Sequence, residues 1–111
     1  MRTWVAQLRK GLVELCIMGT LRGGEAYGYE ILQRLAGRAD HLAVTESTVY
    51  PILARLAKEG LLQVRAAPSP HGPARRYYRL TPSGAQRLAQ MDRHWCGLRD
   101  AVNRIVHGDP T

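Results

Sequence analysis

The last part of the chain repeats apolar residues at alternating intervals of three and four positions, over about three heptads. Thr81 and Pro82 stand just ahead of this stretch and are typical of a helix N-cap and first helical residue. Gly108 and Pro110 are typical of its end. The spacing predicts a helix over about 82–106 whose apolar seam packs against another helix. The seam consists of Leu88, Met91, Trp95, Leu98, Val102 and Ile105.

Another amphipathic helix is predicted near the start of the chain, from about Thr3 to Leu21. Its second half, LVELCIMGTL, is apolar almost all round, so it must be covered on both sides. In a chain of 111 residues a partner subunit is one way to cover it, and we expect a homodimer. The expected interface consists of Leu8, Leu12, Leu88, Met91, Trp95, Leu98, Val102 and Ile105.

Two short helices are predicted between these segments. The first covers about Tyr27 to Gly37, and a turn is expected in 39–44. The second begins with Thr45 or Ser47 as its N-cap, continues to about Glu59 and is stopped by Gly60, a residue that suits a helix C-terminus. Two short helices joined by a tight turn, the second amphipathic, are typical of a helix-turn-helix.

The second of these helices carries polar groups opposite its apolar stripe. They are Ser47, Tyr50, Pro51, Ala54, Arg55 and Lys58, with Thr48 at the edge. Hydroxyls and cations of this kind contact base edges and phosphates, although an ordinary solvated face is the alternative. Pro51 indicates either that the helix begins late or that its first turn is distorted. Either arrangement leaves backbone amides free beside the hydroxyls, as in anion-binding helix N-termini.

A β-hairpin is predicted next, from the alternating pattern of LLQVRAA and RRYYRL on either side of a loop, PSPHGP. Basic residues interleaved with tyrosines often lie on a phosphodiester backbone. We expect phosphate or minor-groove contact from Arg75, Arg76 and the hairpin tip at His71. For Tyr78 and Arg79, cross-strand packing explains the pattern equally well.

The net charge of +7 and a pI near 10.1 favour a nucleic-acid partner over a basic surface that serves solubility alone. Only Lys10 and Lys58 are lysines, and arginine suits bidentate contacts. We expect no membrane span and no signal peptide, and therefore a cytoplasmic protein. We also expect no metal, no cofactor and no enzymatic activity. Cys16 and Cys96 are expected to be reduced thiols.

Three segments together resemble the PadR family of transcriptional regulators: YGYEILQRL, TESTVYPILARLAKEGLL and GPARRYYRLTPSG. The resemblance implies a mainly α fold with a small β-hairpin wing. A winged helix-turn-helix would occupy residues 1–81, and a C-terminal dimerisation helix and tail would occupy 82–111. The first and last helices would build the dimer, which would act as a repressor on a palindromic operator. The expected DNA-binding residues are Thr45, Ser47, Thr48, Tyr50, Arg55, Lys58, His71, Arg75 and Arg76.

The sequence departs from many relatives at Tyr27, where they have histidine, and at Ser47, where they have glycine, so base preference cannot be transferred. Some relatives bind small molecules at the dimer interface. Trp4 and Trp95 are therefore candidates to contact a small aromatic effector, although simple packing of the dimer core also explains them. A winged-helix protein-interaction module and an RNA-binding winged helix are the other interpretations. The polar face of the second short helix favours DNA over an interaction module.

Overall fold

The computed structural model describes residues 2–38 and 44–108. In chain order the elements are α1 (Arg2–Thr20), β1 (Ala26–Tyr27), α2 (Gly28–Arg38), α3 (Glu46–Lys58), β2 (Leu62–Ser69), β3 (Gly72–Leu80) and α4 (Pro82–His107). The mainly helical fold with a small wing and a long last helix is confirmed, and each predicted helix lies within one residue of its expected bounds. The turn expected in 39–44 lies outside the described residues, apart from Val44.

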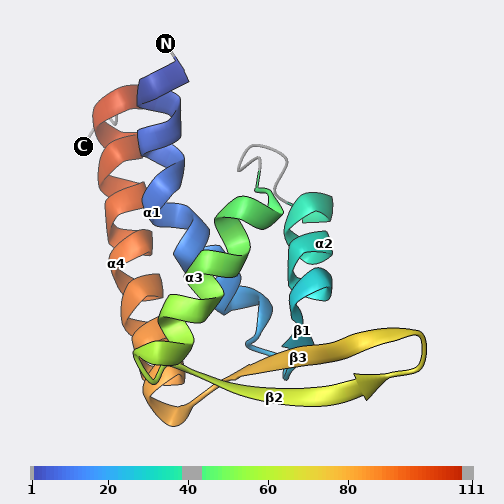
Figure 1. Ribbon diagram of the computed structural model, residues 1–111. Helices are drawn as coiled ribbons and strands as arrows, with labels where there is room; N and C mark the ends of the chain where they lie inside the picture. The colour runs from blue at the N-terminus through green and yellow to red at the C-terminus, as the bar shows by residue number, and fades with distance from the viewer. Residues whose placement is uncertain (1, 39–43, 109–111) are drawn as a thin grey trace.

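The wing is larger than the sequence predicted. Strands β2 and β3 pair antiparallel, and β1 adds a third strand in the order β1-β3-β2. The prediction that the whole segment PSPHGP is a loop was wrong. Strand β2 runs to Ser69 and β3 begins at Gly72, so only two residues separate the strands. Proline is tolerated on an edge strand, and Pro68 falls at an irregularity in the register between Ala67 and Ser69. The strands therefore reach almost to the tip, as Figure 1 shows.

One hydrophobic core joins α1, α2, α3 and the base of the wing. It includes Val13, Ile17, Met18, Leu21, Ile31, Leu35, Val49, Leu53, Leu56, Leu61, Leu62 and Tyr78, all buried. The predicted apolar stripes of α2 and α3 supply their share of this cluster at helical spacing. The start of α1 lies beside the end of α4, because these two helices run antiparallel along one side of the molecule (Figure 1).

The end of α3 is fixed by a glycine. Gly60 has a φ of +78°, its amide donates to the Ala57 carbonyl at 3.1 Å, and the Leu61 amide donates to the Leu56 carbonyl at 3.0 Å. This is the Schellman arrangement, in which a left-handed residue after the helix satisfies its last carbonyls. The predicted helix end is therefore confirmed.

Helix α4 begins against the same turn. The Thr81 hydroxyl donates to the Gly60 carbonyl at 2.7 Å and accepts from the Gly84 amide at 3.0 Å. The Thr81 amide donates to the Leu61 carbonyl at 3.1 Å. Gly84 is buried, and a side chain there would overlap the Leu61 carbonyl oxygen. Only glycine allows the first turn of α4 to approach Leu61 this closely.

We predict that Gly84→Ala lowers the free energy of unfolding by about 2–3 kcal/mol, because the added methyl must displace backbone rather than a side chain. Urea denaturation followed by circular dichroism measures this change. Gly37→Ala is the matched control, since Gly37 lies exposed in α2 with nothing near the added methyl. That variant should be neutral or more stable by up to about 1 kcal/mol. Equal effects at the two sites would contradict the close approach.

Candidate nucleic-acid interface

Three hydroxyls gather at the start of α3. Thr45 is the N-cap residue, and its Oγ1 lies 2.9 Å from Ser47 Oγ and 3.5 Å from Thr48 Oγ1. The Thr45 side chain makes no capping hydrogen bond to the first turn. A helix N-terminus whose amides are not capped by its own side chain favours an anion there. All three residues are exposed, so this cluster faces solvent.

Pro51 lies inside α3, which begins five residues earlier at Glu46. The idea that the helix begins late is therefore wrong. Proline has no amide proton, so the Ser47 carbonyl lacks the hydrogen bond that residue 51 would otherwise donate. Both residues are exposed, and this carbonyl therefore remains an acceptor on the outer face of α3.

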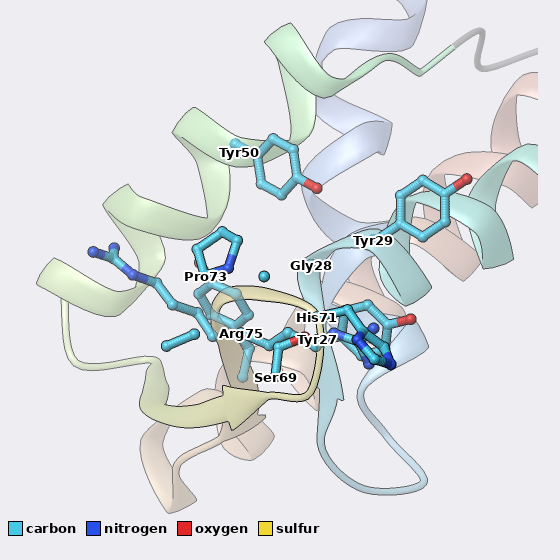
Figure 2. Close-up of a pocket in the computed structure, with 12 residues that line it drawn as sticks. Tyr27, Gly28, Tyr29, Tyr50, Ser69, His71, Pro73 and Arg75 are labelled. Carbon is cyan, nitrogen blue, oxygen red and sulfur yellow. The ribbon is translucent and has the colours of Figure 1, made fainter.

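Tyr50 lies at the edge of α3 that faces α2. A Cβ built on Gly28 would come 2.5 Å from Cε1 of the Tyr50 ring, so the ring packs directly over this glycine. Figure 2 shows Tyr50 projecting from α3 past Gly28, with Tyr29 opposite. Desolvation, and then the Glu46 carboxylate, raise the pKa of the Tyr50 phenol. Tyr50 therefore remains a neutral hydrogen-bond donor at neutral pH.

A groove of about 720 Å³ separates these tyrosines from the outer half of the wing. Gly28, Tyr29 and Tyr50 line the side formed by α2 and α3, whereas Tyr27 of β1 lies with the residues of the wing (Figure 2). The wing residues are Ser69, His71, Gly72, Pro73, Ala74, Arg75, Arg76 and Tyr78. The groove is open and carries arginines and phenols, which suits a polyanion more than an apolar ligand.

Arg55 lies at the opposite edge of α3 and points toward α1. It forms an ion pair with Glu14 of α1 and a second with Glu59 of α3, at 3.2 Å. The three side chains remain partly exposed, so these pairs contribute little to stability. Their main effect is to orient the guanidinium and to offset its charge.

The outer face of the wing holds a row of stacked side chains. Arg75 lies over the Tyr27 ring and Arg65 over the Tyr77 ring, each with 4.6 Å between Cζ and the ring centroid. The Tyr27 and Tyr77 rings meet edge to face, with centroids 5.6 Å apart. Arg65 also forms an ion pair with Glu25 at 2.5 Å, and this hydrogen-bonded contact lowers the pKa of the Glu25 carboxyl.

Tyr78 and Arg79, for which the sequence left DNA contact and cross-strand packing as equal alternatives, both make contacts within the chain. Arg79 donates from Nε and Nη2 to Gln63 Oε1 across the strands, at 2.9 and 2.6 Å. Tyr78 is buried and belongs to the core. Cross-strand packing therefore accounts for Arg79, and core packing accounts for Tyr78.

All nine predicted DNA-binding residues are exposed, and they lie on α3, on its N-cap and on the wing. Tyr50, His71, Arg75 and Arg76 line the groove together. The other five, Thr45, Ser47, Thr48, Arg55 and Lys58, lie outside it along α3. Sequence reasoning missed Tyr27, Gly28 and Tyr29 as groove residues. Only the adjacent glycine and tyrosines in YGY could have indicated that a backbone and an aromatic ring approach there.

The predicted dimer seam divides into two parts. Leu88 and Met91 pack against the core of their own chain, and Leu12 and Trp95 are half-buried. The remaining residues are exposed: Leu8 by 63%, Leu98 by 62%, Val102 by 51% and Ile105 by 81%. The apolar surface that needs a cover therefore lies where the start of α1 meets the end of α4.

A second cavity, of about 510 Å³, lies between α1 and α4. Trp95, Leu88 and Asp92 of α4 and Cys16 of α1 are among its lining residues. Trp4, the other tryptophan predicted to contact an effector, is exposed and does not line it. Cys16 and Cys96 are free, and burial raises the pKa of the Cys16 thiol, which keeps it protonated at neutral pH.

Residues 2–38 and 44–108 contain no cluster of three potential metal ligands. Within the same ranges, no helix combines the length and the apolar character that crossing a bilayer requires.

A winged helix-turn-helix with a long C-terminal helix defines a class of transcription regulators, and the sequence identifies the family. Residues 17–90 match the Transcriptional regulator PadR-like family, and the chain belongs to it. A PadR-like transcription factor from Bacteroides fragilis has 40% identity, with 89% of this chain and 94% of that one covered and a TM-score of 0.75. A PadR family regulator from Eggerthella lenta has 30% identity, coverage of 95% and 90%, and a TM-score of 0.82.

Bacillus subtilis PadR, solved in complex with operator DNA, is also similar. It has 30% identity and a TM-score of 0.66, over 71% of this chain and 45% of that one. The chain is thus a PadR-family transcriptional regulator.

Proposed function

We propose that the protein is a sequence-specific, homodimeric DNA-binding repressor that recognises a palindromic operator. The observation that carries the proposal is the placement of nine exposed polar and basic residues on α3 and the wing, four of them around one groove. In this proposal α3 lies in the major groove and the wing arginines contact the adjacent backbone. The operator complex of the Bacillus subtilis relative supports duplex DNA as the ligand.

The chemistry of α3 favours base contact over a protein partner. Its outer face presents the hydroxyls of Ser47 and Thr48, the Lys58 cation and the small side chain of Ala54. An interaction module would more often expose apolar residues there. In the described chain the large apolar side chains that are more than half exposed lie instead on α1 and α4.

Those apolar residues support dimerisation, with 1–81 as the DNA-binding unit and 82–111 as the dimerisation helix and tail. Leu98, Val102 and Ile105 lie on α4 near its end, and Trp4 and Leu8 lie near the start of α1. The two helices run antiparallel side by side, so these residues belong to one side of the molecule (Figure 1). A contiguous apolar surface of this kind marks an interface. A second copy covers it with the same residues, as two-fold symmetry requires.

A small aromatic effector is the regulatory part of the proposal. The cavity between α1 and α4 places the half-buried Trp95 ring beside Asp92 and next to the proposed dimer surface. A planar ligand stacked there would shift the two helices that set the separation of the two copies of α3. The exposed Trp4 would contact such a ligand only from the partner's side of the interface.

DNA binding predicts a steep dependence on salt. The dissociation constant for a 30-base-pair duplex should rise steeply between low and moderate salt, and Arg76→Ala should reduce the logarithmic slope by about 0.9 for each wing that contacts phosphate. Arg93→Ala is the matched control, because it removes the same charge from an exposed position on α4. Fluorescence anisotropy measures both. Absence of duplex binding at low salt would overturn the function, and tighter binding to RNA would favour the RNA-binding alternative.

Dimerisation predicts that a charge in the exposed seam separates the subunits. Ile105→Asp should convert a dimer into a monomer in sedimentation velocity and should weaken operator binding by at least tenfold, since each monomer contacts one half-site. Asn103→Asp introduces the same charge two residues away, at a position that the apolar seam does not use. The control should remain dimeric. A wild-type chain that sediments as a monomer would contradict this part of the proposal.

Effector binding predicts quenching of Trp95 alone. In a Trp4→Phe variant Trp95 is the remaining tryptophan, so a planar aromatic cation such as proflavine should quench its fluorescence in the absence of DNA. Trp95→Phe should lose this binding response. An unquenched Trp95 across cationic and neutral planar compounds would leave packing as its role.

A further inference from the structure

Two arginines, Arg65 and Arg75, stack on tyrosine rings on the outer face of the wing, but they differ in their charge partners. Five side chains form a continuous row across three segments: Arg75, Tyr27, Tyr77, Arg65 and Glu25. At one end the charge of Arg65 is offset by Glu25. Arg65 donates from Nη2 to Glu25 Oε1 at 2.5 Å and from Nε to Glu25 Oε2 at 3.3 Å. At the other end Arg75 lies over Tyr27, and within 2–38 and 44–108 it forms no ion pair. Arg75 therefore keeps its full charge while its position is restrained.

Three contacts hold Tyr27 in place, two through its backbone and one through its ring. Its backbone pairs with Tyr77 in β3, and its amide donates to the Glu30 carboxylate at 3.0 Å. Its ring meets the Tyr77 ring edge to face. Tyr27 and Arg75 both line the groove that Tyr50 borders, so the restrained cation lies at the candidate DNA surface.

We propose that Tyr27 is a positioning residue for DNA binding. Its ring holds the Arg75 guanidinium at the groove for a backbone phosphate, while Tyr77, Arg65 and Glu25 support the ring and make no DNA contact themselves. This inference rests on the proposed function. An arginine on a flexible stem loses considerable rotamer freedom when it binds, and stacking on an aromatic face removes much of that freedom before the phosphate arrives.

The test separates positioning from charge. Binding of a 30-base-pair duplex is measured against salt for Tyr27→Leu, Tyr27→Phe, Arg75→Ala and the double variant with Leu and Ala. Tyr27→Leu should weaken binding about two- to fivefold for each contacting wing and leave the salt slope unchanged, because no charge is lost. Arg75→Ala should weaken binding and reduce the slope by about 0.9 per wing. Tyr27→Phe should bind like the wild type, since it keeps the ring.

The double variant should bind no more weakly than Arg75→Ala alone, since Tyr27 then has no cation to hold. Replacing Arg65 and Glu25 together by glutamine tests the support of the ring on the same face. It keeps the net charge, so the salt slope should stay unchanged, and it should weaken binding by no more than Tyr27→Leu does. If Tyr27→Leu lowers the melting temperature, Arg75→Lys provides a second measure: the charge and slope remain, and affinity falls because the planar stack is lost.

Three results would overturn the inference while leaving DNA binding intact: Tyr27→Leu binding like the wild type, an equal loss from Tyr27→Leu in the Arg75→Ala background, or Arg75→Ala without effect. A wild-type protein that does not bind the duplex at low salt would instead overturn the proposed function.

Discussion

The arrangement of the molecule depends on the contact between the first turn of α4 and the backbone at Leu61. The Schellman turn at Gly60 stops α3 and directs the chain into β2. Thr81, at the end of β3, binds both Gly60 and Leu61, and Gly84 lets α4 approach the same point. One junction therefore fixes α3, the base of the wing and the start of α4. A close-packed interior has few voids that could absorb a displacement. A shift of α4 would therefore move α3 and the wing with it.

The parts of the fold that follow one strong local rule were predictable. Helical periodicity predicted the bounds of α1 to α4 to within one residue. Gly60 indicated the end of α3, and Thr81 with Pro82 indicated the start of α4. The strand β1 was not predictable, because two residues have no period and form a strand only when β3 pairs with them. The length of the hairpin was underestimated because Pro68 and Pro73 suggested a loop, whereas both positions tolerate proline in this sheet.

Candidate site residues were predictable as exposed members of α3 and the wing, but their partners were not. A face can be read from periodicity, whereas the ion pair of Arg55 with Glu14 joins residues 41 positions apart and depends on how α1 crosses α3. For the same reason the sequence could not distinguish Arg65, neutralised by Glu25, from Arg75, which stacks on Tyr27. The formal net charge of +7 counts every arginine equally. Arginines that are paired with carboxylates nevertheless contribute less to the electrostatic field at the surface of the protein than unpaired ones do.

Helix α1 links the two halves of the proposed function. Its outer half exposes Trp4 and Leu8 beside the end of α4, and its inner half enters the core beneath α3. Glu14 lies between these halves and holds Arg55 at one edge of α3. A partly exposed ion pair of this kind is weak enough for Arg55 to exchange one oxyanion for another. In the proposed function a phosphate would therefore take the guanidinium from Glu14, and any rearrangement of α1 at the proposed dimer surface would change how readily Arg55 is released.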